Sequence, residues 1–327
     1  MLNTLSLRSL NCKSTKIYSY MPQYGSIKRH PLTSLLLLIL LFLTCYIVFA
    51  FIAFFLASLM YGKDILAIAA GDVDTGMLRL IQGVTSAGAF ILPPLILSWT
   101  ERKYGINYFG DYKNASVQLI LLTVVIMFVS SPFLEWTIRI NQNMHLPEFL
   151  RGLENWMREK EDQLENMTKQ LLTMNSISDF LINLLIIALI PAIGEELVFR
   201  GGVQNIFSRW TGNYHLGIWI AAILFSAIHV QFFGFIPRML LGALFGYLFV
   251  WSRSIWIPVL AHFINNGTAV TGAYFLQRKG KSLEELDKIQ DNSSPYMVVV
   301  SIVFASLILW AFYTYRTKTN LIDEQNG

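Results

Sequence analysis

The chain has 327 residues, of which 54% are apolar and only 14% are charged, and its formal net charge is +4. A mean hydropathy of +0.49 excludes an ordinary soluble domain. The Lys and Arg residues cluster at the ends of apolar runs, which favours membrane lipids over nucleic acid as the partner of the positive charge. The two cysteines, Cys12 and Cys45, predict no disulfide framework.

Residues 1–31 are predicted to be a cytoplasmic leader. Residues 1–30 contain five Lys or Arg and no Asp or Glu, and such a positive flank favours retention on the cytoplasmic side. Residues 32–177 are predicted to hold the N-terminal transmembrane helices and one surface helix. Apolar runs long enough to cross a bilayer predict the spans, at about 32–61, 77–99 and 115–139.

The stretch 147–169 breaks this pattern because it is rich in Glu, Lys and Arg, with apolar residues on a roughly helical period. It predicts an amphipathic helix at the membrane surface, between the third and fourth spans. A lid that gates access of a substrate is the alternative interpretation of the same stretch.

Residues 178–275 are predicted to be the catalytic core, and residues 276–327 a loop, the last transmembrane helix and a tail. The remaining spans are expected at about 178–209, 214–231, 236–251, 254–275 and 296–315. The predicted fold is therefore an all-α, polytopic membrane helix bundle of about eight transmembrane helices. We expect a multi-pass protein of the plasma (inner) membrane with both termini in the cytoplasm.

Two adjacent carboxylates, Glu195 and Glu196, lie in the fourth span, where an ionised group is costly and suggests a function. Glu196 and Arg200 are four residues apart, so they lie on one helical face and are predicted to form an ion pair. Glu195 points about 100° away and has no local cation. In an apolar pocket it is suited to act as a general base near neutral pH. Alternatively, both carboxylates pair with the arginines of this segment and have only a structural role.

Three further polar residues lie in later spans. His229 follows Phe225 by four residues, and His262 precedes Asn266 by four, so each pair shares a helical face. Each histidine could simply be a hydrogen-bonding group between helices. Because polar groups in lipid need partners, we expect these residues to converge with the glutamates.

Such a cluster supports two kinds of chemistry. Glu195 could deprotonate a water while His229, His262 and Asn266 polarise a carbonyl and stabilise the oxyanion. Alternatively His229, His262 and Glu196 could bind a divalent metal such as Zn²⁺ with one coordination position open. The sequence contains no His-Glu-x-x-His motif, so the common metalloprotease arrangement is absent.

Three motifs in this order resemble the CAAX protease and bacteriocin-processing family of intramembrane proteases, which includes the type II CAAX prenyl endopeptidases. They are Glu-Glu-x-x-x-Arg at 195–200, Phe-x-x-x-His at 225–229 and His-x-x-x-Asn at 262–266. The resemblance covers roughly residues 180–270. It implies that Glu195 activates the attacking water, that Glu196 and Arg200 support it, and that His229, His262 and Asn266 bind a metal or form the oxyanion site. Both a metal-dependent and a metal-free glutamate mechanism are consistent with it.

The sequence therefore predicts an intramembrane endopeptidase that cleaves membrane-associated or lipid-linked proteins or peptides, with no nucleic-acid partner. One alternative is a proton-coupled transporter in which the same residues relay protons, although no inverted repeat is visible. A non-catalytic membrane scaffold or bacteriocin-immunity factor is the other alternative.

Overall fold

The computed structural model describes residues 29–110, 115–283, 285 and 294–326. The predicted leader, residues 1–31, therefore lies almost wholly outside the described residues. Within the described part the chain is helical and contains no β-strand, which confirms the all-α prediction. The main helices are α2 (Pro31–Tyr61), α3 (Ile65–Ala69), α4 (Thr75–Glu101), α5 (Val117–Val129), α6 (Ser131–Gln142), α7 (Arg151–Leu172), α8 (Ile177–Asn183), α9 (Ile190–Glu196), α10 (Asn205–Thr211), α11 (Tyr214–Ala227), α12 (Phe235–Ser252), α13 (Trp256–Arg278) and α15 (Pro295–Asn326).

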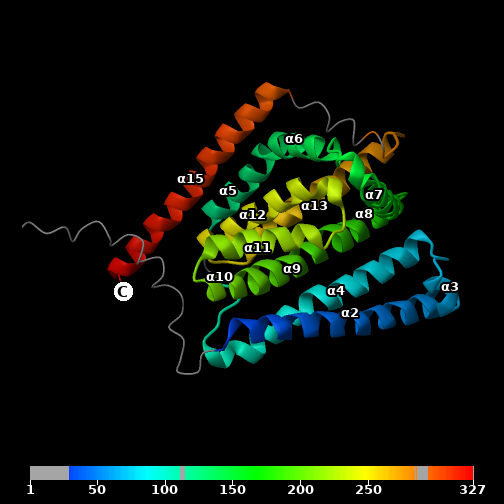
Figure 1. Cartoon of the computed structure of the whole chain (residues 1–327), viewed down its shortest axis with the longest axis horizontal. Helices are drawn as coiled ribbons and strands as arrows, with labels where there is room; N and C mark the ends of the chain where they lie inside the picture. Colours follow the sequence, from blue (N-terminus) through cyan, green and yellow to red (C-terminus); the bar gives the residue numbers. More distant parts are fainter. Residues whose placement is uncertain (1–28, 111–114, 284, 286–293, 327) are drawn as a thin grey trace, which may run out of the picture.

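The bundle is built around the continuous helical segment α8 to α10 (Figure 1). On one flank α4 packs against α9, and α2 packs along α4. On the other flank α11, α12 and α13 cover the segment, and α5, α6 and α15 form the outermost layer. The motif-bearing helices thus occupy the centre, and the N-terminal pair and α15 lie at the edges.

Five helices of the described part are long and apolar enough to cross a membrane, or six if α5 and α6 count as one bent span. The predicted count of eight is not confirmed. The expected span at 214–231 is α11, which has only 14 residues, and α13 does not pass the same test of length and apolar character. α11 buries only one face, which includes Phe225, and α13 carries His262 and Asn266. The chain is nevertheless a multi-pass membrane protein by length and composition.

The expected third span, at about 115–139, is a bent pair of helices rather than a straight one. Its halves meet at 43° beside Pro132. Proline has no N–H to donate to the carbonyl oxygen of Phe128 four residues earlier, and the Ser131 hydroxyl donates to it instead at 2.9 Å. The bend therefore has a local cause in the sequence.

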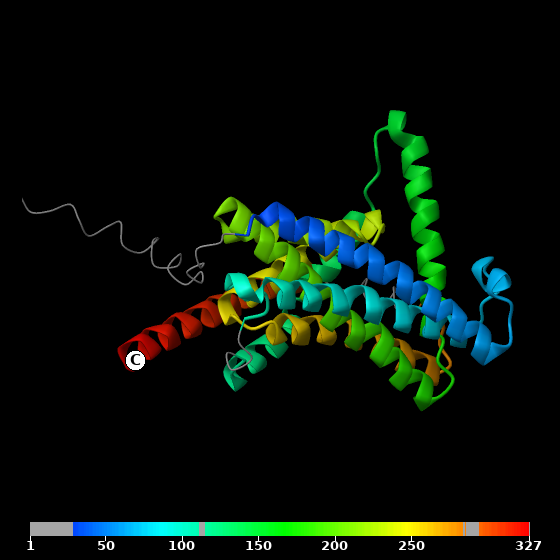
Figure 2. The same ribbon diagram turned by 90° about the horizontal axis from the view of Figure 1, so that it is seen from below.

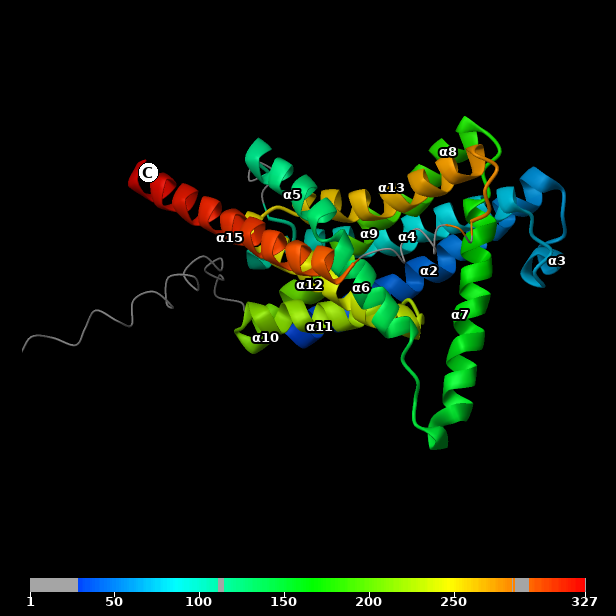
Figure 3. The same cartoon turned by 90° about the horizontal axis from the view of Figure 1, so that it is seen from above.

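The predicted surface helix is α7, preceded by the short turn η3 (Glu148–Leu150). Figures 2 and 3 show that α7 runs crosswise to the other helices and extends beyond the side of the bundle. If the bundle crosses a bilayer, this direction is the one a helix lying along the membrane surface would take. Its placement on lipid remains a prediction.

Candidate active site

The segment that carries the first motif is irregular on both sides of α9. Two π-helical stretches flank it, η4 (Leu184–Leu189) and η5 (Leu197–Gln204). Pro191 at the start of α9 cannot donate to the carbonyl oxygen of Ile187, four residues earlier. The side-chain amide of Asn266 donates to that oxygen at 3.2 Å. The proline therefore leaves an acceptor that ties α13 to the motif segment.

The predicted ion pair between Glu196 and Arg200 is confirmed. Arg200 Nη1 donates to Glu196 Oε1 at 2.9 Å, and the two side chains are 1% and 0% exposed. The guanidinium also lies between two aromatic rings, with its Cζ 4.6 Å from the ring centre of Phe225 and 5.3 Å from that of Phe245. The rings stabilise a cation that the bundle interior would otherwise disfavour.

Two glycines of α12, Gly242 and Gly246, allow this arrangement. Arg200 Nη2 donates to the carbonyl oxygen of Gly242 at 3.0 Å, and Gln204 Nε2 donates to that of Gly246 at 3.2 Å. A Cβ atom at Gly246 would lie 2.7 Å from Gln204 Oε1 and 2.8 Å from Ile218 Cγ2. Small residues four apart permit close helix packing, and here they allow side chains of η5 to reach the backbone of α12.

His262 connects the two glutamates. Its Nδ1 lies 2.8 Å from Glu196 Oε1 and its Nε2 lies 3.9 Å from Glu195 Oε2. Because a carboxylate only accepts hydrogen bonds, the proton of this contact belongs to Nδ1 of the histidine. The ring stacks on Phe245 at a centroid distance of 5.4 Å, which fixes its plane. One imidazole is thus held by Glu196 and directed at Glu195.

His229 lies just beyond the end of α11. Its Nδ1 donates to the carbonyl oxygen of Phe225 at 2.7 Å, so in the neutral ring its Nε2 is an acceptor. That Nε2 lies 3.9 Å from Glu195 Oε2. The next residue, Val230, has φ of 54°, an uncommon value for a β-branched residue, and the chain turns there. His229 and His262 therefore lie equally close to Glu195.

Glu195 Oε2 and the Nε2 atoms of His229 and His262 surround a gap of the right size for a small molecule. Glu195 Oε2 is buried and has no hydrogen-bond partner among the described residues. A separation of 3.9 Å to each Nε2 is too long for a direct hydrogen bond but suits a bridging water about 2.8 Å from each atom.

A cavity of about 700 Å³ opens from this gap. Four of the six predicted site residues line it: Glu195, His229, His262 and Asn266. The ion pair of Glu196 and Arg200 is not part of the lining and lies behind the wall. The structure therefore separates the four residues that face the cavity from the two that lie behind them.

Sequence reasoning missed several residues of the same cavity. Arg238 of α12 lines it, and the charges of Glu161 and Glu195 act on its guanidinium. Glu161 and Glu165 reach the cavity from the crosswise helix α7. Arg238 could have been noticed as a cation within an expected span. The α7 carboxylates belong to a charged face without any motif, so only the fold brings them here.

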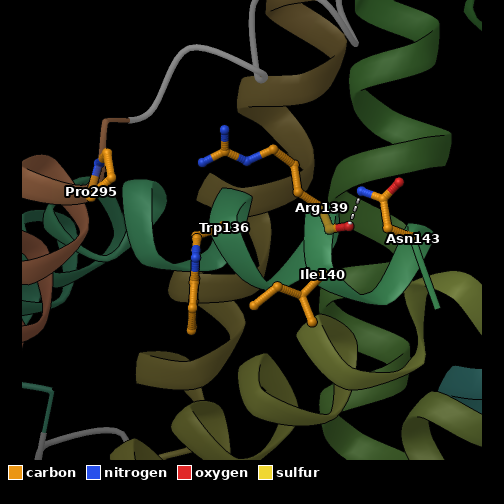
Figure 4. Close-up of a pocket in the computed structure, with 5 residues that line it drawn as sticks. All are labelled: Trp136, Arg139, Ile140, Asn143 and Pro295. Atoms are coloured by element: carbon orange, nitrogen blue, oxygen red, sulfur yellow. Dashed lines mark hydrogen bonds between the residues drawn. The ribbon is translucent and has the colours of Figure 1, made fainter.

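A second hollow, of about 520 Å³, lies between α6 and the start of α15 (Figure 4). It is lined by Trp136, Arg139, Ile140, Asn143 and Pro295. None of these five residues is a carboxylate, histidine or cysteine, so the hollow offers no group suited to act as a base or a metal ligand at neutral pH.

The predicted metal set of His229, His262 and Glu196 does not converge on one point. Glu196 faces Nδ1 of His262, whereas His229 lies with Glu195 on the Nε2 side. Glu196 Oε1 is also occupied by Arg200. Across the described residues no group of three or more His, Cys, Asp or Glu is placed to hold a metal ion. The metalloendopeptidase interpretation has no support from this donor arrangement.

Residues 177–268 match the family described as type II CAAX prenyl endopeptidase Rce1-like. The uncharacterized protein YpbD of Bacillus subtilis (strain 168) is 29% identical over 86 residues, which cover 25% of this chain and 41% of that protein. An uncharacterized 24.3 kDa protein of Escherichia coli is 34% identical over 100 residues, which cover 29% of this chain and 46% of that protein. The chain thus spans less than half the length of these curated relatives. No solved structure matches it.

The family match supports an enzyme, because Rce1-like proteins are generally proteases. The matched range includes all six predicted site residues and the elements that position them. Over residues 177–268, therefore, the resemblance predicted from the three motifs is confirmed by the match to the type II CAAX prenyl endopeptidase Rce1-like family.

Proposed function

We propose that this protein is an intramembrane endopeptidase that hydrolyses peptide bonds of membrane-associated or lipid-linked proteins or peptides. The observation that carries the proposal is the position of Glu195 Oε2, which faces Nε2 of both histidines at 3.9 Å in the wall of the cavity. A carboxylate with an open hydrogen-bonding position beside two imidazoles is suited to hold and deprotonate a water.

The charges of the site are consistent with this role. Glu195 and Glu196 contribute two negative charges and Arg200 one positive charge. The remaining negative charge faces Arg238, a cation in the wall of the same cavity, which lowers the cost of burying the carboxylates. His262 donates from Nδ1 to Glu196, which leaves Nε2 directed at the cavity, where the proposed mechanism uses it as a donor to the substrate.

In the proposed reaction Glu195 takes a proton from the water, and the water oxygen bonds to the carbonyl carbon of the substrate. His229 Nε2 accepts a hydrogen bond from the second O–H of the water and orients the nucleophile, while His262 Nε2–H donates to the developing oxyanion. The intermediate collapses with cleavage of the C–N bond, and Glu195 returns its proton to the leaving amine. Asn266 has one N–H on Ile187, and its second N–H is proposed to join the oxyanion site.

No step of this mechanism uses a metal. The support is the separation of the predicted ligands onto opposite nitrogens of His262. A metal-independent hydrolysis requires only the glutamate, the two histidines and the ordered water.

The experiment is a cleavage assay with the full chain in proteoliposomes, a peptide library and mass spectrometry, with and without a chelator. Glu195→Gln should lower turnover by about 10²–10⁴-fold, the usual contribution of a general base. The matched control is Glu159→Gln, an exposed carboxylate of α7 outside the cavity lining. Wild-type turnover in Glu195→Gln would show that the general-base assignment is wrong. Loss of activity with chelator and its return with Zn²⁺ would show that the metal-free mechanism is wrong.

A further inference from the structure

The bundle has two distinct ends, which can be assigned from side-chain contacts. At one end, here called the Arg29 end, Arg29 Nε lies 3.0 Å from Glu101 Oε1, joining the start of α2 to the end of α4. At the opposite end, called the α7 end, Arg79 Nη1 pairs with Asp179 at 2.5 Å. Gln277, near the end of α13, donates to the carbonyl oxygen of Leu172 at 2.8 Å there. Figures 1 and 3 show the two ends on opposite sides of the molecule.

The cavity leads from the site towards the α7 end. Its lining on α13 continues from His262 to Gly272, and α13 ends at Arg278, at the α7 end. It also includes Gln142 at the end of α6 and the α7 carboxylates. No described residue of 29–110, 115–126, 196–224 or 246–261 belongs to the lining, and these ranges include the start of α2, the end of α4 and α10, which lie at the Arg29 end. Glu165, whose side chain is 47% exposed, marks its outer rim.

The charge pattern indicates which end is cytoplasmic. Residues 1–30, which precede α2, contain five Lys or Arg and no acid. The connector after α2, residues 62–74, contains one Lys and three Asp. The first span usually dominates orientation, and the flank with more Lys and Arg stays in the cytoplasm. This rule places the Arg29 end in the cytoplasm and the α7 end on the opposite side.

From these observations we infer that the cavity opens on the non-cytoplasmic face, and that the substrate is an extended peptide segment presented from that face. The identity of the occupant as a substrate rests on the proposed function, whereas the direction of the opening does not. A cavity that opens on this face cannot take a lipid-modified C-terminus directly from the cytoplasm.

The depth of the site adds a requirement on the substrate. From Gly272 to His262 is ten residues of helix, or about 15 Å at the α-helical rise. An extended chain advances by about 3.3–3.6 Å per residue, so at least four or five residues must be unfolded to reach Glu195. Flexible segments next to a membrane anchor have this property, whereas folded domains do not.

The test uses single-cysteine variants of the full chain, with Cys12→Ser and Cys45→Ala, in spheroplasts treated with a sulfonated maleimide. Asp162→Cys on α7 and Lys103→Cys at the Arg29 end are both exposed and outside the cavity lining. Asp162→Cys should be labelled at least about tenfold more strongly than Lys103→Cys, because a charged probe does not cross hydrocarbon. After lysis the two should react equally. The reverse pattern would overturn the inference, and Glu159→Cys with Arg102→Cys provides a second pair if either variant fails to fold.

Access is tested separately, with a membrane-impermeant mixture of fluorescence-quenched peptides added outside sealed spheroplasts. Cleavage by the wild type and not by Glu195→Gln is the expected result. Cleavage that begins only after lysis would overturn the inference even if α7 is labelled from outside. Labelling as expected, with no cleavage before or after lysis, would instead count against the proposed function and leave the orientation in place.

Discussion

Replacing Arg200 with methionine removes the cation of the buried ion pair and keeps a side chain of similar length. In the wild type the guanidinium donates to Glu196 and to the carbonyl oxygen of Gly242, and its side chain is 1% exposed. The variant leaves the Glu196 carboxylate buried with His262 as its remaining partner. Removing one partner of a buried pair costs about 3–5 kcal/mol, since the other charge stays in a medium of low polarity.

This cost should be visible as a lower midpoint of thermal unfolding in detergent. At roughly 2 °C per kcal/mol for a chain of this size, the expected decrease is about 6–10 °C. The assay is fluorescence-detected size exclusion after heating, and the control is Arg102→Met, an exposed cation. An exposed charge contributes only about 0–1 kcal/mol, so the control should remain close to the wild type.

A double variant separates loss of charge balance from loss of packing. Glu196→Gln together with Arg200→Met removes both charges and keeps an acceptor for His262 Nδ1, so most of the lost stability should return. A midpoint for Arg200→Met within the error of the wild type would refute the reasoning. So would a double variant less stable than the single one, because buried charge would then not be the cause.

Three further predictions follow from other contacts. Gly246→Ala should lower the free energy of unfolding by about 1–3 kcal/mol, because its Cβ would lie 2.7 Å from Gln204 Oε1. The control is Gly152→Ala, which has open space around it and should not destabilise the protein. Equal thermal midpoints for the two variants would contradict the close approach at Gly246. Asn266→Leu should cost about 1–3 kcal/mol in the same assay, because it removes the donor on the Ile187 carbonyl; an unchanged midpoint would show that this contact is dispensable. Hydrogen bonds from Arg158, the Leu146 amide and His145 lower the pKa of Glu154 to about 2. The stability that the ionised Glu154 carboxylate gives to the preceding loop is therefore present above pH 4.5, its usual pKa, and is lost as the pH falls from there towards 2. Proteolysis of residues 143–147 should increase between pH 5 and pH 3 in the wild type but not in Glu154→Gln.

The contacts predicted from the sequence agree with the structure where the information is local. An i,i+4 spacing is sufficient to place Glu196 beside Arg200, and the structure shows that pair. The same reasoning put Glu195 on another face, yet His262 contacts Glu196 with one nitrogen and faces Glu195 with the other. Helical periodicity could not show this, because the link is made by a residue 66 positions away.

The count of spans and the lining of the cavity were harder to predict from the sequence, because both depend on contacts between distant segments. Hydropathy does not show where an apolar helix ends, and α11 stops after 14 residues, too few for the span expected at 214–231. Arg238 and Glu161 carry no motif, and their chemistry depends on the cavity into which the fold brings them.

By itself the sequence determined the membrane class, the helical fold and the three motifs, because burial in lipid and helical spacing act over a few residues at a time. Only the tertiary structure decided which atoms meet. It directed both histidines at Glu195, set Glu196 and Arg200 behind the wall, and opened the cavity towards the α7 end. These features depend on packing between segments far apart in the chain, where two glycines, one proline and a short helix fix distances that no local pattern encodes.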